Sequence, residues 1–494
     1  MPTITVQAPA SKSHSHRALI GAALAVGESV VHNVLESVDL TRTRTVLEAA
    51  GARITRLEAG TYAVTGMAGV PRGTGLNGET VVANLANLKG LENPTAATST
   101  TTPAASEEPT IAPLSCDMHE SGTSCRLLTA ILAAGRGHFC IHGAPRLHDR
   151  PIGELVDVLR QLGAEIHYMD KDGYPPLHIN TFGLAIEDGG DVVLGMDMSS
   201  QFLSGLLLAA PMMNMTNMTN GLLRITVGGK VAVSWPYVGL TLQALEDYGV
   251  PFTVETRDPS LPEDQSPWLV TDWRTISEAV PFGTRFIMES APFIAGKHAV
   301  EGDWSGASYL LAAGALGTQP VEVCGLRANS IQGDRSMLDI LEAMGAKITI
   351  NQEAQSITVY PSKLRGIKVD MGHCPDLVPT VAVLAAFAEG STTIYNAAHL
   401  RIKECDRIAA PIAELAKIGV VAEAHDDGMT IHGGVNIEPQ ATILFSSYGD
   451  HRIAMSLALL GLRGVTVNLD DPACVSKSFP AFWDVWKVIA DGQG

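Results

Sequence analysis

The sequence predicts an α/β protein built from a repeated unit. A helix-like stretch that ends in glycine and leads into a strand-like start recurs as VLEAAGARI (46–54), VLRQLGAEI (158–166), ALEDYGVPF (244–252), ILEAMGAKI (340–348) and ELAKIGVVA (414–422). Each glycine has the position of a residue that ends a helix before a strand. The intervals between them are irregular but long, which indicates a repeated α/β unit rather than a solenoid. The composition, 46% hydrophobic with 48 glycines, is typical of this class.

Between the repeats, apolar stretches of helical length follow small or charged polar residues. They are RALIGAALAVG (17–27), SCRLLTAILAAG (124–135), SSQFLSGLLLAAP (199–211), GASYLLAAGALG (306–317) and HRIAMSLALLGL (451–462). This order places backbone N–H groups and hydroxyls at helix N-termini, where anions bind readily.

Two segments lack the pattern of the repeats. Residues 92–113, ENPTAATSTTTPAASEEPTIAP, have no hydrophobic period and are interpreted as a flexible surface insertion. The segment RDPSLPEDQSP (257–267) is acidic and proline-containing, and we expect a second insertion near 257–290. The 494 residues are long enough for two to four domains.

Charge and cysteine content exclude several classes of protein. The net charge of −18 makes nucleic acid an unfavourable partner. The seven cysteines form no C-x-x-C pair, and their odd number fits reduced thiols in a cytoplasm. The N-terminus has no signal-peptide core and no apolar run is long enough to span a bilayer, so we expect a cytoplasmic protein without a membrane partner.

The run Arg401-Ile-Lys-Glu-Cys-Asp-Arg407 holds five charged residues in a chain that is only 17% charged. On a helix, Lys403 and Arg407 would share one face, and Glu404 and Arg407 would lie at i and i+3. Two cations there would hold an anion, and the carboxylates would orient the cations or move a proton. A solvated charged face is the simpler interpretation of an isolated run.

This run is one of five similar helix starts. The others are Ser11–Arg17, Glu120–Arg126, Ser199–Gln201 and Asp450–Arg452. Each alone could be an ordinary cap, but together in an acidic protein they predict binding of anionic ligands. Arg146–Pro151 is a basic turn that suits a phosphate or carboxylate clamp. His14-x-His16 lacks further ligand spacing for a metal, and no Walker A, dinucleotide-binding or G-x-S-x-G motif occurs.

These motifs resemble, in order from about residue 8 to 484, those of the 5-enolpyruvylshikimate-3-phosphate synthase family of enolpyruvyl transferases. The matching stretches are ASKSHSHRALI, SGTSCRLL, PRLHDRPIGELVDVLRQLGAEI, SSQFLSGLLLAAP, SWPYVGLTL, VEGDWSGASYLLAAGAL, NSIQGD, PDLVPTVAVLAAFAEG, RIKECDR, YGDHRIAM and SKSFP. The resemblance implies transfer of the enolpyruvyl group of phosphoenolpyruvate to the 5-hydroxyl of shikimate 3-phosphate, through a tetrahedral intermediate, with release of phosphate. It implies no metal or organic cofactor.

The resemblance also implies a set of site residues. Phosphoenolpyruvate would be held by Lys12, Gly122, Arg150, Gln201, Arg407, Arg452 and Lys477. Shikimate 3-phosphate would be held by Lys12, Ser13, Arg17, Ser199, Ser200, Gln201, Ser234, Tyr237, Asp376 and Lys403. The implied catalytic residues are Asp376, which takes the 5-hydroxyl proton, Glu404, which transfers a proton to the methylene carbon, and Lys12, Lys403 and His451.

The implied fold is a two-lobed inside-out α/β barrel of six repeated α/β units, three per lobe. Residues 1–12 would give the first strand of lobe 1, residues 13–302 lobe 2, and residues 303–494 the rest of lobe 1. The chain would be a monomer that closes its lobes on substrate. The departures from the family pattern are His16, Glu120, Leu127 and His399-Leu400, which bear on the details of the substrate pocket.

Two alternatives stay open at this point. A sister enzyme uses UDP-N-acetylglucosamine and carries a reactive cysteine on a mobile loop, whereas the matching loop here, Pro145–Pro151, has none. A member of the family that binds shikimate phosphates without catalysis is the other. The resemblance further implies that glyphosate occupies the phosphoenolpyruvate site and that Gly122 leaves room for it.

Overall fold

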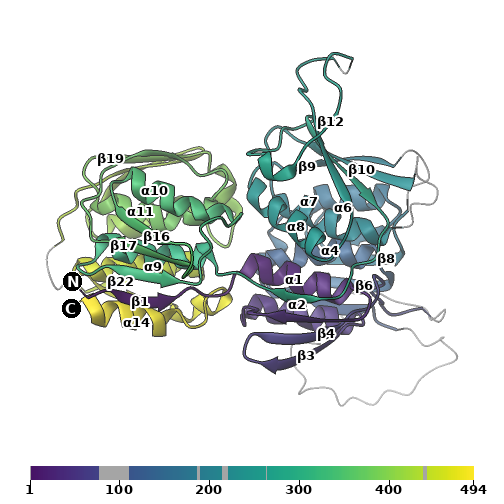
Figure 1. The fold of residues 1–494 in the computed structure, drawn as a ribbon, viewed down its shortest axis with the longest axis horizontal. Helices are drawn as coiled ribbons and strands as arrows, with labels where there is room; N and C mark the ends of the chain where they lie inside the picture. Colours follow the sequence, from purple (N-terminus) through teal and green to yellow (C-terminus); the bar gives the residue numbers. More distant parts are fainter. Residues whose placement is uncertain are drawn as a thin grey trace.

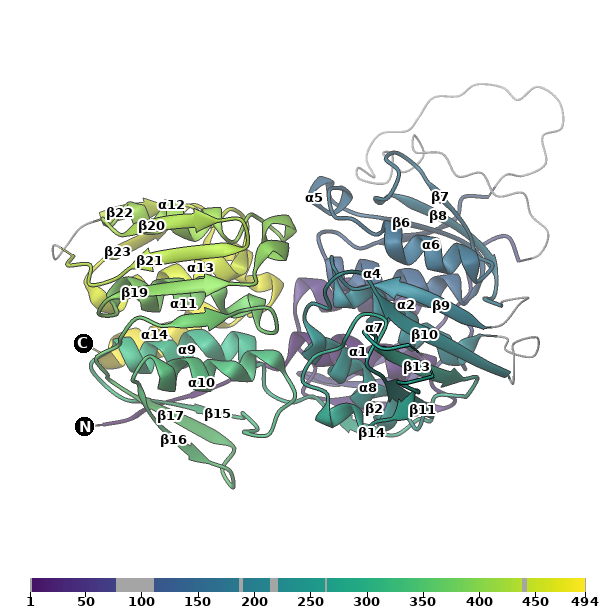
Figure 2. The same ribbon diagram turned by 90° about the horizontal axis from the view of Figure 1, so that it is seen from above.

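The computed structural model describes residues 2–76, 111–185, 190–213, 221–262, 264–437 and 442–493. Within these ranges the chain has a mixed α/β fold, which confirms the predicted fold class. Two bodies lie side by side and are joined by two chain segments (Figure 1 and Figure 2). The predicted insertion at 92–113 lies outside the described residues except for its last three positions.

Each body has its own hydrophobic core. The internal core draws its buried residues from between Ala18 and Val300. The terminal core combines the N-terminal residues Ile4, Val6 and Ala8 with buried residues between Trp304 and Ile489. We call the two parts the internal body and the terminal body after these cores.

The internal body contains three sheets. Their strand orders are β14-β2-β4-β3, β5-β6-β8-β7 and β12-β11-β13-β10-β9. The strands are β2 Glu28–His32, β3 Arg53–Glu58, β4 Thr61–Thr65, β5 Leu114–Asp117, β6 Arg136–His142, β7 Glu165–Tyr168, β8 Leu177–Phe182, β9 Asp191–Gly195, β10 Leu222–Gly228, β11 Phe252–Thr256, β12 Leu269–Val270, β13 Thr284–Glu289 and β14 Lys297–Ala299.

The terminal body also contains three sheets, ordered β1-β15-β17-β16, β18-β19-β21-β20 and β22-β23. The strands are β1 Ile4–Gln7, β15 Val321–Cys324, β16 Lys347–Asn351, β17 Ser356–Tyr360, β18 Lys368–Asp370, β19 Ser391–Tyr395, β20 Val421–His425, β21 Gly428–His432, β22 Thr442–Phe445 and β23 Thr466–Leu469.

One strand pattern recurs among the described sheets. A parallel pair such as β5 and β6 is extended by two antiparallel strands, β8 and β7. The sheets that begin with β1 and β15, β14 and β2, β9 and β10, and β18 and β19 repeat this arrangement. The glycines of the sequence repeat, Gly51, Gly163, Gly249, Gly345 and Gly419, all have positive φ, as residues that end a helix in the left-handed region do.

Helices pack against these sheets and against one another. In the internal body these are α1 Lys12–Leu24, α2 Val38–Ala49, α4 Gly122–Ala133, α5 Pro145–His148, α6 Gly153–Gln161, α7 Ser200–Ala209 and α8 Trp235–Asp247. In the terminal body they are α9 Trp304–Leu316, α10 Met337–Ala343, α11 Val378–Phe387, α12 Ala409–Ala416, α13 His451–Ala458 and α14 Phe482–Gln493. Every residue of α9 and α13 is buried, as expected for helices that are surrounded by other elements.

The C-terminal bound predicted for the insertion near 257–290 lies too far along the chain, because it includes strand β13. Strand β13 (Thr284–Glu289) lies between β10 and β11, and its Phe286 and Met288 are buried in the internal core. The chain between β11 and β13 projects from the internal body (Figure 1). The insertion is therefore limited to residues before Thr284.

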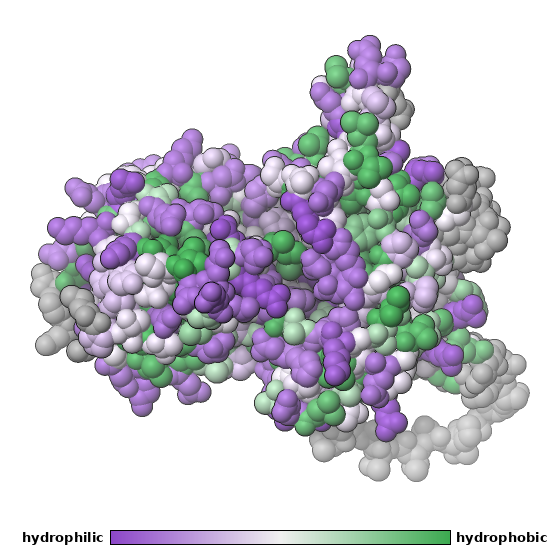
Figure 3. All heavy atoms as spheres, viewed as in Figure 1, coloured by the Kyte–Doolittle hydropathy of each residue, from purple (hydrophilic) through white to green (hydrophobic). Residues whose placement is uncertain are grey.

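The two crossings between the bodies run side by side. Ala10 pairs with Gly302 in an antiparallel bridge, and the Lys12 N–H donates to Asp303 Oδ2 at 2.8 Å. On the face shown in Figure 3, hydrophilic side chains gather around the junction of the bodies. No helix in the described part of the chain is long and apolar enough to cross a membrane.

Candidate active site

A cavity lies between the two bodies, lined by residues of both. The N-terminal residues of several helices line it, including Lys12 and Ser13 of α1, Gly122 and Thr123 of α4, Ser200 and Gln201 of α7, Gly306 of α9, and His451 and Arg452 of α13. The first-turn N–H groups of a helix are unsatisfied within the helix and favour negative charge. Five helix N-termini around one cavity therefore make a site for a ligand with more than one anionic group.

The local sequence explains how these helices begin where they do. Ser121 accepts a hydrogen bond from the Ser124 N–H, and Ser199 accepts one from the Gln201 N–H. Asp450 accepts one from the Arg452 N–H at 2.9 Å. These caps leave the following residue of each helix facing the cavity, and the cap Ser11 likewise brings Lys12 of α1 to it. Four of the five predicted helix starts therefore reach the cavity as expected.

The fifth predicted helix start, Arg401–Arg407, has a different form. Residues after Ile402 form an irregular loop, and α12 begins only at Ala409, so Lys403 and Arg407 do not share a helix face. Asp406 Oδ1 accepts from the N–H groups of Ile408 and Ala409 and so caps α12. The expected helical spacing is wrong, although Arg407 and Glu404 still form an ion pair at 2.9 Å.

We call the cavity residues that the internal body contributes the internal wall, and those of the terminal body the terminal wall. Hydroxyl groups dominate the internal wall. Ser13, Ser199, Ser200, Ser234 and Tyr237 all line it. Ser234 has φ +57°, a strained value for a residue with a side chain, directly before α8. This conformation turns the chain so that both Ser234 and Tyr237 reach the cavity.

The cations of the internal wall are partly engaged in this structure. Lys12 pairs with the buried Asp39 at 2.8 Å. Arg126 is buried and donates to Gln201 Oε1 at 3.1 Å, and burial lowers the pKa of its guanidinium to about 9. Arg17 does not line the cavity, since its guanidinium donates at 2.8 Å to the main-chain oxygens of Ser13 and Tyr237. It therefore supports two residues that do line the cavity.

The terminal wall is an interlocked set of ion pairs. Arg407 donates to Asp376 Oδ1 at 2.8 Å, to Glu404 Oε2 at 2.9 Å and to Asp450 Oδ2 at 2.7 Å. Arg452 pairs with the other oxygen of Asp376 at 2.5 Å. Because Arg407 is 2% exposed, these carboxylates are what neutralise its charge in the absence of a ligand.

These pairs set the ionisation of the two carboxylates. Burial acts to raise the pKa of Asp376, but Arg452, Arg407 and Lys403 outweigh burial and hold that pKa below its usual range. Burial likewise acts to raise the pKa of Glu404, and Arg407, Arg150 and Lys477 hold it well below its usual value. Both groups are therefore anions at neutral pH.

Other titratable groups beside them are shifted by burial. Burial lowers the pKa of Lys403 to about 8 against the opposing effect of Asp376. Burial also lowers the pKa of His451, and neither ring nitrogen has a hydrogen-bond partner among the described residues. Burial and the charge of Asp376 raise the pKa of Asp334 to about 7. Asp450 Oδ1 lies 3.8 Å from Nδ1 of His451, beyond hydrogen-bond distance, so this buried imidazole beside the cavity is suited to a ligand's polar group.

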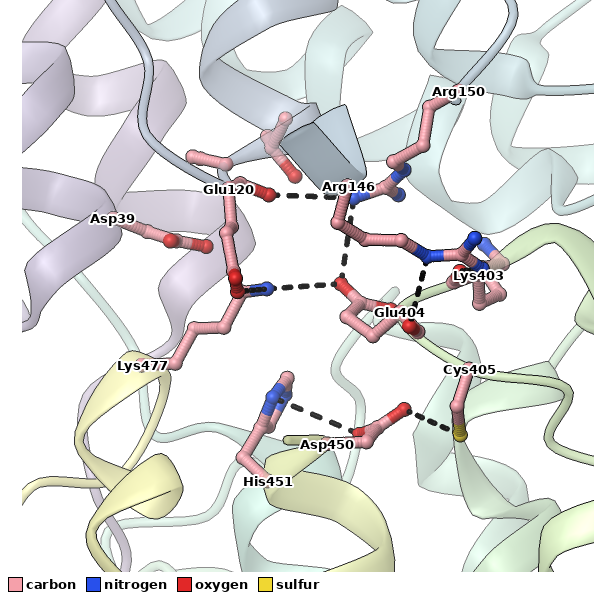
Figure 4. A network of polar contacts seen from close by, with 12 residues as sticks. Asp39, Glu120, Arg146, Arg150, Lys403, Glu404, Cys405, Asp450, His451 and Lys477 are labelled. Carbon is pink, nitrogen blue, oxygen red and sulfur yellow. Dashed lines mark hydrogen bonds and ion pairs between the residues drawn. The ribbon is translucent and has the colours of Figure 1, made fainter. Parts of the chain in front are cut away.

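Several contacts cross the cleft (Figure 4). Arg150 lies 3.6 Å from Glu404 Oε1, and Lys477 lies 3.6 Å from the same atom. Lys477 also reaches Glu120 at 3.4 Å. Lys477 does not itself line the cavity, although the adjacent Ser478 does. Glu404 is thus the point at which cations of both bodies meet.

Gly122 allows a close approach of Arg150. A Cβ atom at position 122 would lie 2.5 Å from Arg150 Cζ, which is closer than real side-chain contacts. The guanidinium can sit against the start of α4 only because Gly122 has no side chain.

The structure brings nearly all predicted site residues to one cavity. Those that line it are Lys12, Ser13, Gly122, Arg150, Ser199, Ser200, Gln201, Ser234, Tyr237, Asp376, Lys403, Glu404, Arg407, His451 and Arg452. Asp39 and Ser305 also line the cavity without a role predicted from the sequence, whereas Asp303 was expected only at the lobe boundary and His399 only as a departure from the family pattern. Asp303 lies in the quoted motif VEGDWSGASYLLAAGAL, which was the available signal. Within the described residues, no group of three or more metal-ligating side chains could hold a metal ion.

Comparison with known proteins gives a consistent result. The profile of the EPSP synthase (3-phosphoshikimate 1-carboxyvinyltransferase) family matches residues 3–72, 77–262 and 283–486. A 3-phosphoshikimate 1-carboxyvinyltransferase of Burkholderia vietnamiensis is 37% identical over 98% of this chain and 96% of its own length. The enzyme of the same name from Nitrosomonas europaea is 36% identical over 98% and 95%. An EPSP synthase structure from Acinetobacter baumannii shares the fold with a TM-score of 0.70 and is 24% identical in sequence. The match covers 99% of this chain and 95% of that one.

Proposed function

This chain belongs to the EPSP synthase (3-phosphoshikimate 1-carboxyvinyltransferase) family, and we propose that the cavity between its two bodies is where the reaction occurs. The enzyme transfers the enolpyruvyl group of phosphoenolpyruvate to the 5-hydroxyl of shikimate 3-phosphate and releases phosphate. This is a step of the shikimate pathway, which leads through chorismate to the aromatic amino acids. The observation that carries the proposed location is the meeting of five helix N-termini and the Arg407 cluster at one cavity.

The two walls suit the two substrates differently. The hydroxyls of Ser13, Ser199, Ser200, Ser234 and Tyr237, with Lys12, Gln201 and the supporting Arg17, would hold shikimate 3-phosphate. Arg407, Arg452, Arg150, Lys477, Lys12, Gln201 and the Gly122 backbone would surround phosphoenolpyruvate. Arginine forks match carboxylate and phosphate oxygens, which supports this division.

Substrate binding would raise the pKa values of the two carboxylates, so that they can accept protons. The phosphate and carboxylate of phosphoenolpyruvate would compete with Asp376 and Glu404 for the same guanidinium groups. Once those cations are shared with the ligand, the pKa values of Asp376 and Glu404 rise from their depressed positions. The site therefore gains its proton acceptors when the substrates arrive.

The proton movements then balance as follows. Asp376 takes the proton of the 5-hydroxyl as the hydroxyl oxygen bonds to C2 of phosphoenolpyruvate. Glu404, which takes up a proton from solvent once its pKa has risen, gives that proton to the methylene carbon. In the second step Glu404 removes a proton from the new methyl group, the C–O bond to phosphate breaks, and the departing phosphate takes the proton from Asp376. Lys403, Lys12 and the neutral His451 would orient the reacting groups.

The overall organisation follows from the same family. We propose six α/β units in two lobes, three per lobe, with helices inside, and with boundaries at 1–12, 13–302 and 303–494. The five recurring sheet patterns and the separate cores support this division. A monomer in the cytoplasm is the proposed state, and the seven free cysteines support its location in a reducing compartment.

Phosphate release tests the proposed function. The purified enzyme is incubated with phosphoenolpyruvate alone, with shikimate 3-phosphate added, and with UDP-N-acetylglucosamine added. We expect phosphate release only with shikimate 3-phosphate. Release with UDP-N-acetylglucosamine would identify the sister activity, and binding of shikimate 3-phosphate without any release would identify a non-catalytic binder.

A further inference from the structure

Arg146 makes a contact across the cleft that neither substrate site accounts for. It lies on the four-residue helix α5 of the internal body, in the turn that the sequence analysis interprets as an anion clamp. Its Nη2 donates to the main-chain oxygen of Lys403 at 2.7 Å, and its Nε donates to that of Glu404 at 3.1 Å. Figure 4 shows the side chain extended toward Glu404 and Lys403. The hydrogen-bond acceptors of Arg146 are thus two consecutive carbonyls of the terminal body, and its Nη1 lies 3.6 Å from Asp149 of the same turn.

These two carbonyls belong to the loop that carries the reacting side chains. The loop lies between the short 3₁₀ helix Ala398–Ile402 and α12, so an α-helical hydrogen-bond ladder does not fix the orientation of its peptide groups. A guanidinium with two donors in a rigid plane can hold two adjacent carbonyls at once. The direction of the Lys403 and Glu404 side chains depends on the orientation of the same peptide groups.

The same turn also holds the side chain of Glu404. Arg150, four residues after Arg146, lies 3.6 Å from Glu404 Oε1. The internal body therefore contacts Glu404 twice, at its backbone through Arg146 and at its carboxylate through Arg150. Both contacts require the bodies to be close together, because α5 and the loop belong to different bodies.

We propose that Arg146 is a positioning residue that orients Lys403 and Glu404 when the two bodies close. It acts through the main chain and touches neither substrate nor the reacting atoms. The inference rests on the proposed function, in which Glu404 moves a proton and Lys403 binds shikimate 3-phosphate. Closure of the cleft brings Arg146 to the carbonyls of Lys403 and Glu404, so the same movement also aligns the Glu404 side chain.

The test compares three variants with the parent enzyme. Arg146→Ala removes both donors, and Arg146→Lys keeps the charge but not the planar pair of donors. Arg160→Ala is the matched control, since Arg160 also donates through Nε and Nη2 to a main-chain oxygen, that of Ile166, within the internal body. The two arginine side chains are similarly exposed, at 41% for Arg146 and 39% for Arg160.

We expect Arg146→Ala to lower kcat by roughly tenfold or more, the range for loss of hydrogen bonds from a charged donor, with KM for shikimate 3-phosphate changed less than threefold. Arg146→Lys should recover part of the loss, and Arg160→Ala should stay within twofold of the parent. A kcat for Arg146→Ala within twofold of the parent, or an equal loss in Arg160→Ala, would overturn the proposal.

A second measurement does not depend on turnover. Amide hydrogen exchange of residues 403–407 is followed with shikimate 3-phosphate and glyphosate present. The parent and Arg160→Ala should show slowed exchange in this loop, and Arg146→Ala should not. Equal protection in all three proteins would contradict the positioning role. A parent enzyme without turnover would instead refute the proposed function, while the exchange result would still report on the Arg146 contact.

Discussion

The two walls of the cleft solve different physical problems. The internal wall presents neutral hydroxyls and helix N-termini, such as Ser200 at the start of α7, and these groups can bind phosphate oxygens without a buried net charge of their own. The terminal wall places Arg407 in contact with Asp376, Glu404 and Asp450. The internal wall is therefore suited to hold a ligand. On the terminal wall, the arginines can exchange their carboxylate partners for the anionic groups of a ligand.

The terminal wall needs its ion pairs because burial of an unpaired charge is costly. Arg407 and Asp450 are both almost completely buried, so neither could remain charged alone. Asp376 and Glu404 are the exchangeable members of the cluster, since both also line the cavity. An anionic substrate can take their place on the arginines and leave them free to accept protons. The predictions below test this division, from the largest expected effect to the smallest.

The largest effect is expected on the terminal wall. Asp376→Asn and Glu404→Gln remove proton acceptors while keeping shape, and each should lower kcat by roughly a hundredfold or more. Glu414→Gln is the control, because Glu414 is a buried, ion-paired glutamate of the same body that does not line the cavity. Steady-state kinetics at saturating substrate measure the effect. Near-normal turnover in both variants would show that Asp376 and Glu404 do not transfer protons in the reaction.

The boundary between the walls is tested at Gly122. An alanine there places its Cβ atom 2.5 Å from Arg150 Cζ, so the guanidinium must shift away from the start of α4. We expect glyphosate to inhibit the parent in competition with phosphoenolpyruvate, and Gly122→Ala to weaken this inhibition strongly. Leu127→Pro should improve it only modestly. A parent as insensitive as the alanine variant would show that the site is already narrowed.

The internal wall should show its effect in binding. Ser200→Ala removes a hydroxyl that faces the cavity, and we expect KM for shikimate 3-phosphate to rise about tenfold with kcat nearly unchanged, as for loss of a hydrogen bond to a charged group. Thr129→Ala is the control, because its buried hydroxyl donates to the main-chain oxygen of Cys125 within α4 and does not line the cavity. A fall in kcat without a change in KM would place Ser200 in the chemistry instead.

The sequence predicted features that depend on neighbouring residues better than features that depend on distant ones. Ser121, Ser199 and Asp450 cap helices through contacts two or three residues away, so their local patterns were sufficient. Asp39 was missed because an acidic residue two positions after the cap Ser37 has an ordinary explanation in the helix dipole. Its pairing with Lys12 is visible only in the folded chain.

The errors have a similar cause. The charge spacing of Arg401–Arg407 suggested a helix. In the folded chain Arg407 instead donates to Asp376 on another element, and Asp406 accepts from the Ile408 N–H just before α12 begins at Ala409. The clamp predicted for Arg146–Pro151 stays a prediction for Arg150, which lines the cavity. Arg146 itself donates to backbone carbonyls of the other body, and a sequence does not show that these lie within its reach. The 257–290 insertion was extended over β13 because a polar loop precedes that strand.

The smallest effect concerns pH. Burial lowers the pKa of Lys403 to about 8, so its cation is lost as pH rises through that value in the free enzyme. The rate constant kcat/KM for shikimate 3-phosphate should therefore fall on the alkaline side near pH 8. Lys403→Arg keeps the charge and should move this limb upward by about one pH unit or more. An unchanged alkaline limb would assign it to another group.

The most direct test of the division between the walls is the dissociation constant of shikimate 3-phosphate for Glu404→Gln, measured by calorimetry without phosphoenolpyruvate. Glu404 belongs to the terminal wall and pairs with Arg407. If the internal wall holds this substrate, the variant should bind it within about threefold of the parent while its turnover is lost. A dissociation constant weakened as strongly as kcat would contradict the account, because the same wall would then be responsible for both binding and chemistry.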